Sequence, residues 1–375
     1  MTTLFPGAVD SYSVKVDNVT DVMAAHVNDL QDAVVAIETA VIAQAPNPNL
    51  LYHSLSRDIW PSGLTFNDVA DDSYVAGVWN ALWSGNAPDV SGEAAVIDGS
   101  KRAIKCLVDT NGTQFGFVQF LLNEDTVPLR GKTLSFSIDA VGFNVTSLRC
   151  AILEWTSTAD TLTSDVVGTW AAGNPTLATN WAYIGTPATQ ALSGTTRIKA
   201  EGKTVGATTN NLAVFVWTDA SENSTDYVRL ANAKLEIGLT ATAFVSPGSM
   251  EERFRVAQLY QKSYNMASDP GAAVSEGESR MTSVIAIAGS AAGTIQYSTS
   301  FLVPMYKSPA VTLYASNSGT SGAIRNASVP SDRTGATAFA VSQSGFSAVQ
   351  ISTASANAIA IGDVLAWQYV ADGRL

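Results

Sequence analysis

Charged side chains are scarce in this chain of 375 residues, since Asp, Glu, Lys and Arg make up only 14% of it, against about a quarter in ordinary soluble proteins. Ser, Thr, Ala, Asn and Gly occupy the positions where a cytosolic enzyme carries Lys and Glu. The charges that are present sum to a net charge of −12. Nucleic acids and anionic membranes attract basic surfaces, so we expect neither as a partner.

Long hydrophobic runs are absent as well. The sequence has no stretch of about 20 apolar residues, the length of a membrane-spanning helix. Residues 1–6 lack the basic start and apolar core of a secretory signal. We therefore expect no membrane insertion, and no entry into the secretory pathway by that route.

Histidine and cysteine number two each, which leaves little for catalysis. His26 and His53 have no partners at the spacing of a catalytic triad or a zinc site. We expect no enzyme, no catalytic residues and no such metal ligands; a glycosidase built on two carboxylates stays open, because its acid and base can lie far apart in the chain. Cys106 and Cys150 lie in apolar, strand-like stretches and are predicted to be buried free thiols rather than a disulfide.

One helical pattern stands out near the N-terminus. Residues 23–45 carry apolar residues at alternating spacings of four and three, the seam of an α-helical coiled coil. β-Branched residues at both seam positions favour more than two strands, and so short a helix is marginally stable alone. We predict a homotrimer held by this helix; a helix docked on its own domain is the alternative. The predicted interface residues are Met23, Val27, Leu30, Val34, Ile37 and Val41.

Short alternating runs separated by turn-rich pieces dominate the rest of the chain. That spacing, with no helical period between the runs, predicts a β-sandwich or jelly roll. The predicted fold class is mainly β. In chain order we expect an extended attachment leader (1–20), the short trimeric coiled coil (21–46), a jelly-roll domain (47–248), a short helix with a linker (249–279) and a C-terminal β domain (280–375).

The short helix is predicted over residues 249–264, with Ser249 as N-cap and Glu252 three residues on, as in a capping box. The C-terminal β domain has few bulky residues, so we expect its copies to pack three-fold around a shared core; an independent sandwich on a flexible linker is the alternative. Residues 316–335 are predicted to form an exposed loop.

Seven of the eight tryptophans lie between residues 51 and 250. Proteins recognise sugars with aromatic faces for the C–H side of the ring and with amides and carboxylates for the hydroxyls. Trp83, Trp170 and Trp181 have Asn or Gly nearby and are predicted to be exposed, which makes them the candidate ligand-binding residues. Core packing is the alternative for each of them, and it is the prediction for Trp60 and Trp79.

Two acidic loops offer clustered oxygen ligands of the kind that Ca²⁺ prefers. They are Asp68/Asp71/Asp72 and Asp219/Glu222/Asp226. Neither has the regular Asp-x-Asp-x-Asp-Gly spacing, so solvated turns without a cofactor are expected, and a structural Ca²⁺ is the alternative.

Several segments resemble the carbohydrate-binding-module-like jelly rolls of bacteriophage tail fibres and related virion appendage proteins. The strongest match lies at the close of the domain, which is similar to "LE-x-G…AT-x-F…EE…Q-x-Y-x-K-S". The matching residues are Leu235-Glu236-Ile237-Gly238, Ala241-Thr242-Ala243-Phe244, Glu251-Glu252 and the run from Gln258 to Ser263, with Asn49-Leu50-Leu51 at the opening. Phe301 to Met305 and Trp367 to Leu375 look like tail-fibre C-terminal domains, and the leader resembles the proximal part of phage fibres.

This resemblance implies a homotrimeric structural component of a phage virion, assembled in the host cytoplasm, that mediates attachment to the host cell surface through glycan contacts. Its partners would be further copies of the chain, other virion proteins bound by the leader, and a host glycan or receptor. A head fibre, decoration or connector protein without receptor binding is the alternative.

Overall fold

The computed structural model describes residues 28–35, 37, 48–58, 63–94, 96–266, 268–288, 293–351 and 358–375. The chain divides into two compact units, Met1–Pro48 and Asn49–Leu375. In the first unit, residues 28–35 and 37 are helical, inside the predicted coiled coil. The predicted leader and the interface residues Met23, Val27 and Val41 lie outside the described residues, as does Trp60. Among the described residues, no helix has the length and apolar character needed to cross a membrane.

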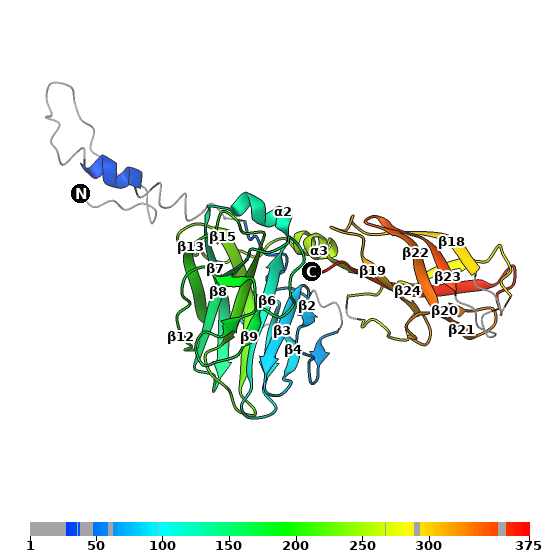
Figure 1. Cartoon of the computed structure of the whole chain (residues 1–375), viewed down its shortest axis with the longest axis horizontal. Helices are drawn as coiled ribbons and strands as arrows, with labels where there is room; N and C mark the ends of the chain where they lie inside the picture. The colour runs from blue at the N-terminus through cyan, green and yellow to red at the C-terminus, as the bar shows by residue number, and fades with distance from the viewer. Residues whose placement is uncertain are drawn as a thin grey trace, which may run out of the picture. The chain divides into compact units, whose positions relative to one another are not determined.

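The second unit consists mainly of antiparallel strands, as predicted, and begins with two sheets that face each other (Figure 1). Sheet 1 has the strand order β1-β4-β5-β15-β7-β13. Its strands are β1 (Thr65–Phe66), β4 (Asp89–Ala94), β5 (Arg102–Leu107), β7 (Thr133–Phe143), β13 (Thr196–Thr204) and β15 (Tyr227–Ile237). Sheet 2 has the order β11-β8-β14-β6-β3-β2, and β12 also pairs with β8. Its strands are β2 (Ser73–Ala76), β3 (Trp79–Ser84), β6 (Gln114–Leu121), β8 (Ser147–Trp155), β11 (Trp181–Tyr183), β12 (Gln190–Ala191) and β14 (Asn211–Thr218).

Alternate side chains of both sheets fill the space between them, which is the period-two pattern of a sandwich. Phe136 and Ile138 of β7 are fully buried and share one apolar cluster with Phe117 of β6. Cys106 and Cys150 are buried free thiols in this core, as predicted, and burial raises the pKa of both. The helix α2 (Asn123–Thr126) and the short 3₁₀ helix η1 (Val127–Leu129) follow β6.

Sheet 2 is also buried on its other face. All residues of β14 are buried, because Val214 and its alternate neighbours face sheet 1 while Phe215 and Trp217 face outward into a second apolar cluster. The connection between β8 and β11 covers this cluster. We call residues 156–180 the cover segment; it includes the hairpin of β9 (Val167–Thr169) and β10 (Thr176–Leu177).

The closing motif of the sandwich folds into a buried polar junction. Lys234 and Glu236 near the end of β15 form an ion pair of 3.0 Å, with side chains only 2% and 0% exposed. Thr242 ties the following loop to this pair, because its backbone N–H and its hydroxyl donate to the Glu236 carboxylate at 2.7 and 2.6 Å. At these positions, the residues that resemble the close of tail-fibre domains therefore stabilise the fold.

The helix α3 (Ser249–Ala257) confirms the start of the predicted helix but ends earlier than residue 264. The predicted capping box is wrong, because Gly248 is the N-cap and no side chain caps the helix. Glu252 is buried and accepts a hydrogen bond from the backbone N–H of Ser54 at 2.7 Å. It therefore fastens α3 to the start of the sandwich instead of closing its own helix.

Residues 258–375 form two further antiparallel sheets. In sheet 3 the strand β24 pairs with β16, β17, β19 and β20, and β21 pairs with β20; sheet 4 has the order β18-β23-β22. The strands are β16 (Tyr260–Lys262), β17 (Ser279–Thr282), β18 (Gly293–Ser300), β19 (Ala310–Ala315), β20 (Ala323–Asn326), β21 (Ser331–Thr334), β22 (Ala336–Ser342), β23 (Gly345–Ile351) and β24 (Val364–Asp372). Phe301, Phe346, Trp367 and Tyr369 lie in one buried cluster here, so a single chain has the bulky core whose absence motivated the predicted three-fold packing.

The expected loop at residues 316–335 is wrong over β20 and β21, which form a hairpin. Arg325 pairs with Asp332 across the two strands at 3.4 Å. Arg333 is buried and donates to the carbonyl of Ala358 at 2.9 Å. The charges are satisfied inside the sheet, which the polar sequence pattern did not indicate.

Candidate functional site

The three candidate tryptophans are not brought together on one surface. Trp181 and Trp170 belong to the cluster under the cover segment, whereas Trp83 packs against the core between the sheets. Trp181 is only 6% exposed; its ring lies 5.2 Å from that of Trp155 and 5.7 Å from that of Phe120. The predicted exposure of Trp181 is therefore wrong, because the cover segment folds back over the strand that carries it.

Trp170 and Trp83 are half-buried. The ring of Trp170 meets Phe215 edge to face at 6.3 Å. Trp83 donates from its indole N–H to the carbonyl of Val69 at 2.9 Å, and from its backbone N–H to the carboxylate of Asp71 at the same distance. Trp79 is fully buried, as predicted, and its indole N–H donates to the carbonyl of His53.

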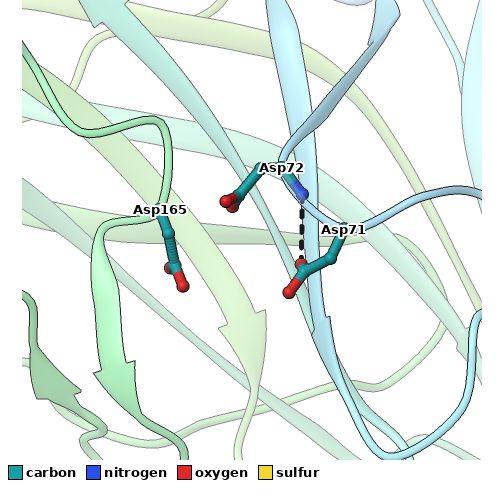
Figure 2. A group of neighbouring side chains, drawn as sticks. All are labelled: Asp71, Asp72 and Asp165. Atoms are coloured by element: carbon teal, nitrogen blue, oxygen red, sulfur yellow. Dashed lines mark hydrogen bonds between the residues drawn. The ribbon is translucent and has the colours of Figure 1, made fainter.

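An acidic cluster forms where the cover segment meets the turn before β2. Figure 2 shows Asp71 and Asp72 on that turn and Asp165 on the cover segment, with their carboxylates turned toward one another. One oxygen of each lies within 4.8 Å of the others. The backbone N–H of Asp72 donates to Asp71 at 3.1 Å, and that of Val167 donates to Asp165 at 2.7 Å.

Crowding of negative charge perturbs this cluster. Burial, followed by the charges of Asp165 and Asp71, raises the pKa of Asp72 to about 6. Burial also raises the pKa of Asp71 and of Asp165, although backbone N–H donors oppose it. Carboxylate oxygens at this spacing are hard ligands suited to Ca²⁺. The first acidic loop of the sequence analysis thus supplies two members, and Asp68 is not one of them.

The second acidic loop holds its carboxylates in separate contacts. Asp219 pairs with Arg149, and Asp226 accepts from the side-chain amide of Asn144 and the backbone N–H of Asn223. Burial and the charges of Asp226 and Asp219 raise the pKa of Glu222 to about 7. These residues stabilise the connection between β14 and β15, and their carboxylates do not form one cluster.

We expect Asp72→Asn to stabilise the protein at pH 7.5 by about 1 kcal/mol, after allowance for solvent screening. Folding raises the pKa of Asp72 from its ordinary value of 3.8 to about 6. The protonated carboxyl therefore stabilises the folded protein fully below pH 3.8, and this contribution is lost as the pH rises through about 6. Asparagine mimics the protonated form and tolerates the positive φ of 58°. Urea unfolding at pH 7.5 and pH 4 measures the gain, which should disappear at the lower pH.

Asp68→Asn is the matched control for this substitution. Asp68 is exposed and also has positive φ, 48°, so it reports the backbone preference of asparagine without the cluster. An equal gain at both pH values, or the same gain from the control, contradicts the proposed repulsion.

A second candidate surface, which the sequence pattern did not indicate, lies on the outer face of sheet 1. We call Glu93, Lys105, Phe143, Tyr227 and Arg229 the platform. On the same strands, at odd spacings from these residues, Ile104, Val228, Ala140 and Val90 face the core, so the alternation of β5, β15, β7 and β4 turns the platform residues outward. Phe143 is 48% exposed and stacks on Tyr227 with ring centroids 5.0 Å apart and an interplanar angle of 8°.

Charged groups surround this aromatic pair. The Lys105 ammonium and the Arg229 guanidinium each lie 4.5 Å from the centroid of the Tyr227 ring. Both also pair with Glu93, through Lys105 Nζ at 3.3 Å and Arg229 Nε at 2.5 Å. Arg229 Nη1 donates to the Tyr227 hydroxyl at 3.1 Å. The platform thus offers a flat apolar face beside fixed donors and an acceptor, the combination that sugar rings require.

Neither histidine forms a further candidate site among the described residues. His53 is fully buried, and burial lowers its pKa. His26 lies outside the described residues.

No family model matches the chain, and no curated protein matches it. The C-terminal family 22 carbohydrate-binding module of Clostridium thermocellum Xyn10B is 14% identical over 48% of this chain and 98% of that module, with a TM-score of 0.29. TmCBM61, solved with β-1,4-galactotriose, is 11% identical over 43% of this chain and 88% of its own, with a TM-score of 0.28. The enzymatically active domain of tailspike protein 4 from Bacteriophage CBA120 is 11% identical over 46% of this chain and 21% of that one, with a TM-score of 0.29. Similarity at this level establishes no function.

Proposed function

We propose that this chain is a non-catalytic, homotrimeric virion appendage, a tail fibre or fibre-like protein, whose platform binds a glycan on the host cell surface. The observation that carries the binding role is the stacked Phe143–Tyr227 pair, half exposed on a rigid sheet and flanked by charged groups. The low charge content and the fibre-like sequence motifs support the virion role. A head fibre, decoration or connector protein without a receptor is the alternative, and it predicts no ligand at the platform.

Phe143→Ala is expected to lower binding of the purified protein to host bacteria about tenfold, because avidity in a trimer multiplies the loss at each weak site. The melting temperature should change little, since the ring is half exposed and lies at the end of β7. Fluorescently labelled protein on whole cells gives the measurement.

Phe339→Ala is the matched control, because Phe339 is a 53% exposed phenylalanine on β22, outside the sandwich. Unchanged cell binding by the Phe143 variant refutes the platform as the contact surface. Equal losses in both variants point to non-specific adhesion and refute it as well.

The homotrimer is proposed from the helical seam. Leu30, Val34 and Ile37 are 62%, 45% and 46% exposed in the single chain, so these apolar side chains have surface left to bury between chains. Leu30→Asp combined with Ile37→Asp should raise the concentration needed for assembly at least about tenfold. Sedimentation velocity measures this, and Val35→Asp, off the seam on the same helix, is the control. A monomeric wild-type protein refutes the trimer.

A further inference from the structure

The charge balance of the platform narrows the class of glycan that it accepts; this inference rests on the proposed function. Two cations, Lys105 and Arg229, share the single carboxylate of Glu93. Burial opposes ionisation of Glu93, but the hydrogen bond and charge of Arg229 and the charge of Lys105 outweigh it and lower its pKa. Glu93 is therefore a carboxylate at neutral pH, and the three side chains together carry one excess positive charge.

The cations also keep donor capacity for a ligand. The contacts of Arg229 to Glu93 and to the Tyr227 hydroxyl use Nε and Nη1, and a guanidinium has further N–H donors arranged to meet a carboxylate in bidentate fashion. The Lys105 side chain is 19% exposed, and its ammonium group has three N–H donors. Both groups are held near Tyr227, so a ligand carboxylate would meet donors that are already positioned.

The surrounding field limits how much negative charge the ligand can carry. Across sheet 1, Leu107 pairs with Tyr227 on one side and with Asp89 on the other, which places a further carboxylate two strands from Tyr227, on the strand that carries Glu93. The whole chain has a net charge of −12. Screening confines attraction by the platform to about 8–10 Å at physiological salt, so a densely charged polymer is repelled while a single carboxylate at the platform is attracted.

We propose that the platform recognises a glycan with isolated carboxylates, such as a polysaccharide with one uronic acid in its repeat. In this arrangement the C–H face of one sugar ring packs on Phe143, and a carboxylate of an adjoining sugar residue accepts hydrogen bonds from Arg229 and Lys105. A neutral glycan makes only the first contact, and a dense polyanion meets repulsion from the rest of the chain.

An array of oligosaccharides from bacterial surface polysaccharides, each uronate-containing member paired with its carboxyl-reduced neutral form, tests the proposal. The full-length protein should bind at least one acidic member about tenfold or more tightly than its reduced partner, as expected for a charge-assisted pair. Arg229→Gln and, separately, Lys105→Gln should bring that ratio toward one while binding of the neutral form persists. Lys199→Gln is the control, because Lys199 lies on β13 of the same sheet and pairs with its own carboxylate, Glu201.

The outcomes separate the two proposals. Equal or stronger binding of neutral forms overturns the acidic preference and leaves the glycan-binding function in place. Unchanged ratios in folded Arg229 and Lys105 variants, with melting temperatures equal to wild type, also overturn it. Absence of binding to every pair, together with cell binding that survives Phe143→Ala, overturns the function itself.

Discussion

Replacing Trp181 with alanine is expected to destabilise the sandwich by about 3–5 kcal/mol. The indole is almost completely buried between the outer face of sheet 2 and the cover segment, in contact with the rings of Trp155 and Phe120. Its N–H also donates to the Thr163 hydroxyl at 3.2 Å. The substitution leaves a cavity and removes the hydrogen bond to Thr163, and the cover segment loses its largest contact with β11.

Urea unfolding followed by tryptophan fluorescence and circular dichroism measures the loss. Trp170→Ala is the matched control within the same cluster: Trp170 is only half-buried and its ring meets Phe215 edge to face, so about 1–2 kcal/mol is expected. If Trp181→Ala keeps the wild-type midpoint and instead lowers cell binding, the ring is a ligand contact and the packing described above is wrong.

Local sequence rules could not predict whether the rings of Trp181 and Trp170 are exposed. Asn180 beside Trp181 does mark a turn, with φ of 72°, but the turn returns the chain onto the sheet instead of into solvent. The cover segment determines the burial of Trp181. Its hairpin has strands of only three and two residues, which are too short to show an apolar alternation in the sequence. Asn180 therefore indicates a turn, and the exposure of Trp181 predicted from it is wrong.

Strands with clear alternation were predictable. Tyr227–Ile237 and Ala310–Ala315 have the bounds that the sequence indicates, because each alternates apolar and polar residues next to strong turn signals. The early strands β1 to β4 were not individually predicted, since they are short and carry Ser, Asn, Gly and charged residues. Their place in the sheets depends on pairing with distant strands.

The candidate sites are assembled across still longer separations. Asp165 joins Asp71 and Asp72 from the cover segment, and Arg229 meets Glu93 across 136 positions of sequence. Spacing rules detect ligands within one loop, so the loop at Asp68, Asp71 and Asp72 was noticed and Asp165 was not. The platform had a signal of its own, the alternation that turns Tyr227 and Arg229 to one face of a strand, but their partners could be identified only from the sheet order.

The second large effect on stability is expected at the buried ion pair of Lys234 and Glu236. Lys234→Met is expected to cost about 3–5 kcal/mol, because it leaves the Glu236 carboxylate charged and almost inaccessible to water. Lys234→Met combined with Glu236→Leu should recover most of this loss, since the double variant removes both charges from the buried site. Lys199→Met, at an exposed pair with Glu201, should change stability by less than about 0.5 kcal/mol.

The same pair should give the protein a distinct response to acid. Burial opposes ionisation of Glu236, but hydrogen bonds from Thr242 and Lys234 outweigh it and lower its pKa below the ordinary 4.5. The stability that this carboxylate contributes is therefore present above that value and lost as the pH falls through the lower folded-state pKa. Urea unfolding at pH 7 and pH 3 should show the wild type losing more stability than the double variant. Equal losses, or a single Lys234 variant as stable as the wild type, would mean that Thr242 and the loop hold the junction without the ion pair.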